Sequence, residues 1–178
     1  AVRGNLLRES PAKSVKPLRL PDKEPPYITR DQVAELYKEC AGWIHTFVAI
    51  AQNTGLRLSE VLALKWEDID LRNGVIKIRS DEDFVTKSRR NREVPVNCYL
   101  HSVLKKAPTH ITFPHVIFTR GGESPTRPGV RDCFLRALKR AGLPVFRIHD
   151  LRHSFGTTLA GAGIDVRTIQ ERMGHSDL

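Results

Sequence analysis

The sequence predicts a mainly α-helical domain of the α+β class, with one small antiparallel sheet between two groups of helices. Apolar residues recur at helical spacing on both sides of a central region, and helix caps mark several of these segments. The central region instead shows short β-like runs separated by turn residues. The chain has 178 residues, 40% of them hydrophobic, which suits one good-sized domain.

Residues 1–26 are predicted to form an extended basic linker. Five of the eleven prolines lie in this segment, and lysines and arginines separate them. Such a composition resists helix formation. We therefore expect the folded domain to span residues 27–178, and the basic segment to be the remnant of a link to a preceding domain. An ordinary flexible terminus is the alternative.

Three helices are predicted before the sheet. The first spans residues 29–39 and begins with a capping box formed by Thr29 and Gln32. The second, mostly apolar, spans residues 43–53, and the third spans residues 58–65.

The predicted sheet and the later helices follow from the same reasoning. Three antiparallel strands are expected at 75–79, 83–86 and 93–96, with turns at 73–74 and 88–91. Four helices are expected at about 98–106, 129–141, 149–162 and 166–173, the last capped by Asp165 and ended by Gly174.

Composition indicates which class of molecule the protein binds and which cell compartment it occupies. The chain has 29 basic and 20 acidic residues, and its net charge of +9 favours a polyanion, nucleic acid first. Cys40, Cys98 and Cys133 are widely spaced and include no CxxC pair, so neither a disulfide framework nor a thiolate zinc site is predicted. There is no secretory signal and no apolar run near the ~20 residues of a membrane helix. We expect a cytoplasmic protein that does not enter a membrane.

The segment "TGLRLSE" places Arg57 between two leucines, where two apolar helices join. A guanidinium group in such surroundings needs a partner, and Glu60 can reach back to it. An arginine held this way keeps its remaining donors aimed in a fixed direction, as bidentate phosphate binding requires. A purely structural ion pair is the simpler interpretation of these residues alone.

The segment "RIHDLRHSFGTTL" places His149, Arg152 and His153 on one side of a helix, together with Gly156. The two histidines have the spacing of a zinc-binding helix, but a guanidinium on the same side would repel a dication. Arginine with a histidine that titrates near neutral pH suits phosphoryl transfer. The glycine leaves space for another backbone to approach, or serves helix packing.

Basic residues also gather around the second predicted turn, in "FVTKSRRNREVPV". Arg89, Arg90 and Arg92 would form a positive tip attractive to a DNA backbone, whereas a charged turn is otherwise simply solvated. Lys87 stands at the end of a strand, which would fix its position.

These segments, read in order together with the histidine of "MGH", resemble the catalytic domain of the tyrosine recombinase (phage integrase) family. The resemblance covers nearly the whole chain after the linker. It implies the tyrosine-recombinase catalytic fold and site-specific DNA recombination, with strand cleavage and religation through a 3′-phosphotyrosyl intermediate.

The resemblance also implies a role for five residues. Arg57 and Arg152 would hold the scissile phosphate and stabilise its transition state. Lys87 would protonate the leaving 5′ oxygen. His149 would act as general acid and base, and His175 would donate a hydrogen bond to the phosphate.

Glu60 and His153 would support these residues, the first by orienting Arg57 and the second by holding the helix that carries Arg152. In this family no metal and no other cofactor is needed, because the energy of the broken phosphodiester is retained in the covalent link to tyrosine. Double-stranded DNA is the implied partner, bound by a homotetramer on paired sites.

Two features depart from the family pattern. Family members carry the nucleophilic tyrosine several residues beyond the "GH" histidine, and this sequence has only Tyr27, Tyr37 and Tyr99, each more simply a packing residue. The family's N-terminal core-binding domain is also absent. We therefore predict that this chain is truncated before its nucleophile, binds DNA as a monomer without cleaving it, and belongs at the nucleoid.

Two other functions remain open from the sequence. One is a non-cleaving DNA-binding regulator that kept the fold and lost the nucleophile. The other is a type IB topoisomerase, which uses similar groups to relax DNA without choosing a site. The close match of "HDLRH" and "MGH" to integrases disfavours the topoisomerase.

Overall fold

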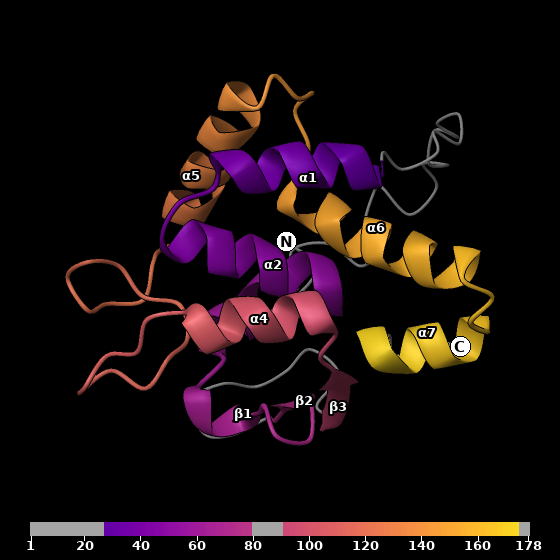
Figure 1. Ribbon diagram of the computed structural model, residues 1–178, viewed down its shortest axis with the longest axis horizontal. Coiled ribbons are helices and arrows are strands. Elements are labelled where there is room, and N and C mark those ends of the chain that lie inside the picture. Colours follow the sequence, from indigo (N-terminus) through magenta and orange to yellow (C-terminus); the bar gives the residue numbers. More distant parts are fainter. Residues whose placement is uncertain (1–26, 80–90, 175–178) are drawn as a thin grey trace, which may run out of the picture.

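The computed structural model describes residues 27–79 and 91–174, and it is mainly helical with one three-stranded antiparallel sheet, as predicted (Figure 1). The predicted linker at 1–26 and the predicted strand at 83–86 lie outside the described residues. No helix among the described residues is long and apolar enough to cross a membrane.

Helix α2 (Trp43–Thr54) is the centre of the fold. Eight of its twelve residues are buried, as expected for a helix that is apolar on most sides. It packs against α1 (Arg30–Glu39), α4 (Cys98–Lys106), α5 (Arg127–Arg140) and α6 (Ile148–Gly161). The site described below is built at the C-terminal end of this buried helix.

The predicted helix starts are confirmed to within two residues. At α1, the backbone N–H of Thr29 donates to the Gln32 side chain (3.0 Å) and the N–H of Gln32 donates to the Thr29 hydroxyl (3.3 Å), which completes the predicted capping box. Helix α5 begins two residues before the predicted start, because Thr126 is its N-cap and Pro128 fits the first turn, where no backbone donor is needed.

Helix α3 (Leu58–Ala63) ends two residues earlier than predicted. The chain leaves the helix because the carbonyl of Leu64 accepts the N–H of Val116 (2.9 Å), and the N–H of Trp66 donates to the carbonyl of Pro114 (3.0 Å). A long-range pairing therefore replaces the last helical turn. A 3₁₀ turn, η2 (Trp66–Asp68), leads from there into the sheet.

The sheet has the order β1-β2-β3, with both pairs antiparallel. Its strands are β1 (Ile69–Asp70), β2 (Val75–Ile78) and β3 (Arg92–Pro95). The turn at 73–74 forms as predicted and joins β1 to β2, with Gly74 at a φ of +66°. Strand β1 was not predicted, because two residues are too few to show an alternating pattern.

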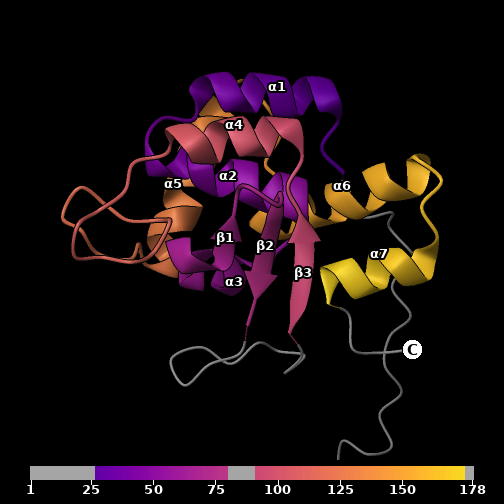
Figure 2. The same cartoon turned by 60° about the horizontal axis from the view of Figure 1, so that its bottom comes forward.

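Helix α7 (Val166–Met173) packs on α6 and runs beside β3 (Figure 2). Its apolar residues Ile169 and Met173 form a small cluster with Phe155 of α6, apart from the main core. The space beside Gly156 is filled by the side chain of Met173, whose sulfur would lie 3.2 Å from an added Cβ. Of the two roles left open for Gly156, helix packing is therefore the one observed, since a side chain of α7 and not another backbone approaches it.

Candidate functional site

Arg57 occupies the joint between α2 and α3. Helix α2 ends at Gly55, which adopts the left-handed conformation with a φ of +65°. Two residues later, the backbone N–H of Arg57 donates to Glu60 Oε2 (2.8 Å) and its Nη1 donates to Glu60 Oε1 (3.2 Å). The predicted pairing of Arg57 with Glu60 is thus present. The Arg57 side chain is 22% exposed, and that of Glu60 is 1% exposed.

A second arginine, Arg92 at the start of β3, binds the same carboxylate. Its Nη2 donates to Glu60 Oε2 at 2.8 Å. Burial would raise the pKa of Glu60, but the hydrogen bond and charge of Arg92, together with the contacts of Arg57, outweigh burial and hold the pKa below its usual value. Glu60 is therefore a buried carboxylate that stays ionised at neutral pH.

Arg152 approaches the joint from α6 and is 2% exposed. Its Nη1 donates to the carbonyl of Gly55, and its Nη2 donates to the carbonyl of Met173 (2.6 Å). Burial, followed by the nearby charge of Arg57, lowers the pKa of Arg152 to about 10. The side chain is still protonated at neutral pH, so a positive charge is held inside the fold without a carboxylate in direct contact among the described residues.

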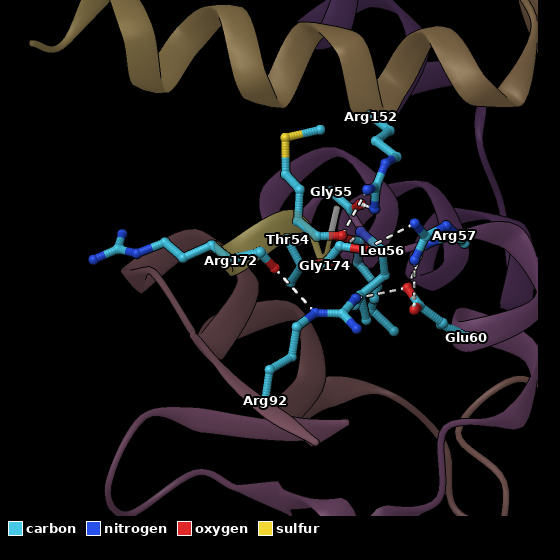
Figure 3. Close-up of polar contacts among 11 residues, drawn as sticks. Thr54, Gly55, Leu56, Arg57, Glu60, Arg92, Arg152, Arg172 and Gly174 are labelled. Carbon is cyan, nitrogen blue, oxygen red and sulfur yellow. Dashed lines mark hydrogen bonds and ion pairs between the residues drawn. The ribbon is translucent and has the colours of Figure 1, made fainter. Parts of the chain in front are cut away.

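The three arginines meet at the C-terminus of α7 (Figure 3). This helix ends at Gly174, with a φ of +67°. Three successive carbonyl groups each accept from a different arginine, with Arg92 Nε donating to Arg172 (3.1 Å), Arg152 Nη2 to Met173 (2.6 Å) and Arg57 Nη2 to Gly174 (2.9 Å). The last carbonyls of a helix carry partial negative charge and lack partners within the helix. The arginines supply these partners.

The cluster of Arg57, Arg92, Arg152 and Glu60 carries more positive than negative charge. Two guanidinium groups bind one carboxylate and a third, that of Arg152, lies beside them, so the net charge is two positive units. Each guanidinium has five N–H donors, and both Arg57 and Arg152 use only part of this set in contacts with described residues. Such an arrangement favours an anion with several acceptor oxygens.

His149 and His153 lie on consecutive turns of α6, as their spacing predicts. Their ring centroids are 4.5 Å apart and the rings are nearly perpendicular. Desolvation, then the neighbouring His153 and Arg152, lower the pKa of His149. His149 is exposed, and at neutral pH the neutral ring, which can accept a proton, is favoured.

The structure corrects the placement of Arg92. The sequence assigned Arg92 to the exposed tip of a turn, but it begins β3 and its side chain is 9% exposed. Strand alternation gives the reason, since Arg92 lies on the same side of β3 as the buried Val94, while Glu93 and Pro95 are exposed. That alternation could have predicted the inward orientation of Arg92, but not its pairing with Glu60, which lies 32 residues away.

Four predicted site residues lie outside the described residues: Lys87, Arg89, Arg90 and His175. Strand β3 follows the segment that contains the first three, and α7 ends two residues before the fourth. The described chain therefore brings together Arg57, Glu60 and Arg152, with His149 and His153 on the same helix as Arg152.

The tyrosines have different surroundings. Tyr37 packs its ring 4.9 Å from that of Tyr99 and accepts a hydrogen bond from Asn53 (3.1 Å), and burial raises its pKa. This agrees with a packing role. Tyr27 is 56% exposed and Tyr99 40% exposed, so both are less buried than the sequence suggested. Within residues 27–79 and 91–174, no group of three or more metal-ligating side chains converges.

Residues 26–178 match the Phage integrase family. A tyrosine recombinase, XerC, of Lactobacillus delbrueckii subsp. bulgaricus is 29% identical over 189 residues, which cover 99% of this chain and 63% of the relative. The integrase of Salmonella phage P22 is 33% identical over 156 residues, which cover 80% of this chain and 39% of the relative. The chain thus spans less than two thirds of the curated relatives it matches.

Solved structures agree with these relatives. The crystal structure of XerA recombinase superposes with a TM-score of 0.77 at 23% identity, over 91% of this chain and 59% of that protein. The integrase of transposon Tn1549, in complex with a circular intermediate DNA, superposes with a TM-score of 0.72 at 25% identity, over 88% of this chain and 60% of that protein. The first likeness establishes the fold alone.

Proposed function

The chain belongs to the phage integrase family of tyrosine recombinases, and from this premise we propose that it is the catalytic region of a site-specific recombinase that cleaves and rejoins DNA strands. The observation that carries the proposal is the cluster of three guanidinium groups, two of which share one buried carboxylate. A scissile phosphate is an anion of the kind this excess charge would stabilise.

The geometry of the described residues supports a proposed role for four of them. Arg57, the more exposed of the two clamp arginines, would bind the phosphate first, and Glu60 would hold it in orientation. Arg152 is covered by the carbonyl of Met173, so its direct contact with a phosphate requires the end of α7 to shift. His149, with its lowered pKa, is suited to accept the proton of an attacking hydroxyl.

Other parts of the proposal concern residues outside the described chain. Lys87 would protonate the leaving 5′ oxygen, and His175, two residues beyond the end of α7, would bind the phosphate. Arg89 and Arg90 would contact the DNA backbone, which needs only exposed positive charge. The nucleophile would be a tyrosine that this sequence does not contain, supplied by a segment beyond residue 178. The chain would work without a metal or other cofactor.

The proposed assembly and location follow the same premise. Residues 1–26 would be the link to a core-binding domain, and 27–178 the catalytic domain. A protein with both domains would act as a homotetramer on paired double-stranded DNA sites, in the cytoplasm at the nucleoid. The 178-residue chain by itself would be a monomer that binds DNA weakly and cleaves none.

The test is covalent trapping. The chain is joined to a tyrosine-bearing C-terminal segment and incubated with a DNA site that contains a nick beside the cleavage position, so that religation is prevented. A covalent protein–DNA adduct is expected, and the same protein with that tyrosine changed to phenylalanine should form none. Absence of any adduct on the cognate site would refute cleavage and favour the non-cleaving regulator.

The topoisomerase alternative is separated by relaxation of supercoiled plasmid that lacks a recombination site. A site-specific recombinase should relax such DNA poorly. Efficient relaxation independent of sequence would favour a type IB topoisomerase over an integrase.

A further inference from the structure

Arg92 connects three parts of the candidate site that are distant in sequence. Its Nη2 binds Glu60 at the start of α3, and its Nε binds the carbonyl of Arg172 at the end of α7. The side chain is 9% exposed, so both contacts are made inside the fold. Figure 3 shows the guanidinium between the Glu60 carboxylate and the last turn of α7.

The contact with α7 extends to Gly174. A Cβ added to this glycine would lie 2.8 Å from Arg92 Nη1 and 2.9 Å from Arg92 Cζ. The guanidinium group therefore lies directly against the α-carbon, and only glycine leaves that space. The left-handed conformation of Gly174, with a φ of +67°, favours glycine for a second reason. Arg92 thus packs against the residue at which the chain leaves α7.

A planar fork is needed for these contacts. One N–H of the guanidinium must reach a carboxylate while another N–H reaches a backbone carbonyl. A lysine ammonium is a single point charge that cannot span both partners. Arg92 Nη1 is buried and has no hydrogen-bond partner among the described residues. Within the described chain, the polar contacts that hold the guanidinium group are therefore those of Nη2 with Glu60 and of Nε with α7.

We propose that Arg92 is a positioning residue for strand cleavage, because it locks the C-terminus of α7, whose last carbonyls accept from Arg57 and Arg152, to the carboxylate of Glu60. This inference rests on the proposed function. It adds a residue whose described contacts are with Glu60 and the end of α7, and which would act through α7 and through the Glu60 partner of Arg57. It also replaces the DNA-contact role that the sequence suggested for Arg92.

The first test uses the 178-residue chain itself and needs no cleavage. Backbone hydrogen exchange is measured by mass spectrometry for the wild-type chain and for Arg92→Lys. Exchange in α7 is expected to rise about tenfold while α1 and α2 are unchanged, because the lysine cannot hold both partners. Unchanged exchange in α7, or an equal rise throughout the chain, would overturn the proposal.

Arg140→Lys is the matched control. Arg140 also forks between a carboxylate oxygen and a carbonyl, both of Glu39, with Nε 3.2 Å from Oε2. Its side chain is 52% exposed, and it joins α5 to α1 rather than to α7. This variant should leave exchange in α7 at the wild-type rate.

The second test uses the protein joined to its tyrosine-bearing segment and measures the rate of adduct formation on a nicked site. Arg92→Lys should slow the reaction at least about tenfold when His175 is present, and should have a clearly smaller effect in the variant His175→Ala, where only the route through Glu60 and Arg57 remains. Equal slowing in both backgrounds would show a merely structural role and overturn the proposal.

The two tests separate the inference from its premise. If the unaltered protein forms no adduct, the proposed function fails, and the exchange measurement alone decides whether Arg92 positions α7. If adducts form but exchange in α7 does not depend on Arg92, the function stands and the positioning role is wrong.

Discussion

At the scale of the residue, the site is defined by how each charge is paired. Glu60 is shared by Arg57 and Arg92, whereas Arg152 is satisfied by the carbonyls of Gly55 and Met173. Backbone carbonyls neutralise a guanidinium only partly, so Arg152 keeps a charge that a phosphate could use. An isolated structural ion pair, the simpler interpretation from sequence, does not account for a carboxylate shared by two arginines with a third arginine beside them.

Arg152→Ala should separate binding from catalysis. In a protein with its tyrosine-bearing segment, the rate of adduct formation should fall by at least about a hundredfold, because a donor to the transition-state charge is removed. Affinity for DNA, measured by gel shift, should change little, because many other basic residues contribute. Arg152→Lys, which keeps the charge, is the control for lost packing. Equal losses of affinity and cleavage would point to a structural arginine.

Glu60→Gln should change the pH dependence of stability. Because the pKa of Glu60 is lower in the folded state than its ordinary value of 4.5, its contribution is present above that value and is lost as the pH falls through the folded-state pKa. The variant should be less stable by about 2 kcal/mol at pH 7 and should lose less stability on acidification. Urea unfolding from pH 7 to pH 3 measures both effects.

The control for this experiment is Glu67→Gln, a change at an exposed position of η2. It should leave the stability at pH 7 and the acid dependence close to those of the wild type. A similar loss in both variants would show that the effect belongs to the overall charge and not to the buried carboxylate.

At the scale of the element, the joint between α2 and α3 decides where the site lies. Gly55 ends α2 in the left-handed conformation, its carbonyl accepts from Arg152, and the ring of Phe155 packs against it. Helix α6 is thereby held close enough for one of its side chains to reach the turn between two other helices. The joint is both a helix cap and part of the site.

Gly55→Ala should be strongly destabilising. An added Cβ would lie 2.5 Å from Phe155 Cδ1, and the φ of +65° disfavours any side chain. We expect a loss of about 3 kcal/mol in the free energy of unfolding by urea, the sum of backbone strain and overpacking.

Gly142→Ala is the matched control for this change. Gly142 has a φ of +64°, but nothing lies within 4 Å of the added Cβ. The Gly142→Ala variant should lose about 1 kcal/mol in the free energy of unfolding, from backbone strain alone. Equal losses at the two glycines would contradict the close packing of α6 on the joint.

At the scale of the whole molecule, a net charge of +9 is combined with a site assembled from four separate segments. Arg57, Arg92, Arg152 and the end of α7 are brought together by packing of α2, β3, α6 and α7. Outside the site, the remaining basic residues would attract a DNA backbone irrespective of its sequence.

Binding of the 178-residue chain to duplex DNA should therefore depend steeply on salt. Contact with about four phosphates predicts that affinity falls roughly a hundredfold between 50 and 200 mM monovalent salt. Fluorescence anisotropy of a labelled duplex measures this slope. The double variant Arg89→Gln and Arg90→Gln should reduce the slope by nearly two phosphate contacts, and an unchanged slope would remove both residues from the DNA surface.

The sequence by itself determined the helices and the pair of Arg57 with Glu60, because both depend on residues three or four positions apart. It did not reveal β1, which is too short to show a pattern, nor the early end of α3 and the pairing of Arg92 with Glu60, since these two depend on partners far along the chain.

Only the tertiary structure decided what surrounds the arginines. The carbonyls of Gly55, Arg172, Met173 and Gly174 belong to the backbone, which every residue shares, so no sequence pattern distinguishes them as partners. Their positions follow from how α2 and α7 end and from the packing that brings those ends together. The residues that could carry the chemistry were therefore readable from the sequence, and the geometry that holds them was not.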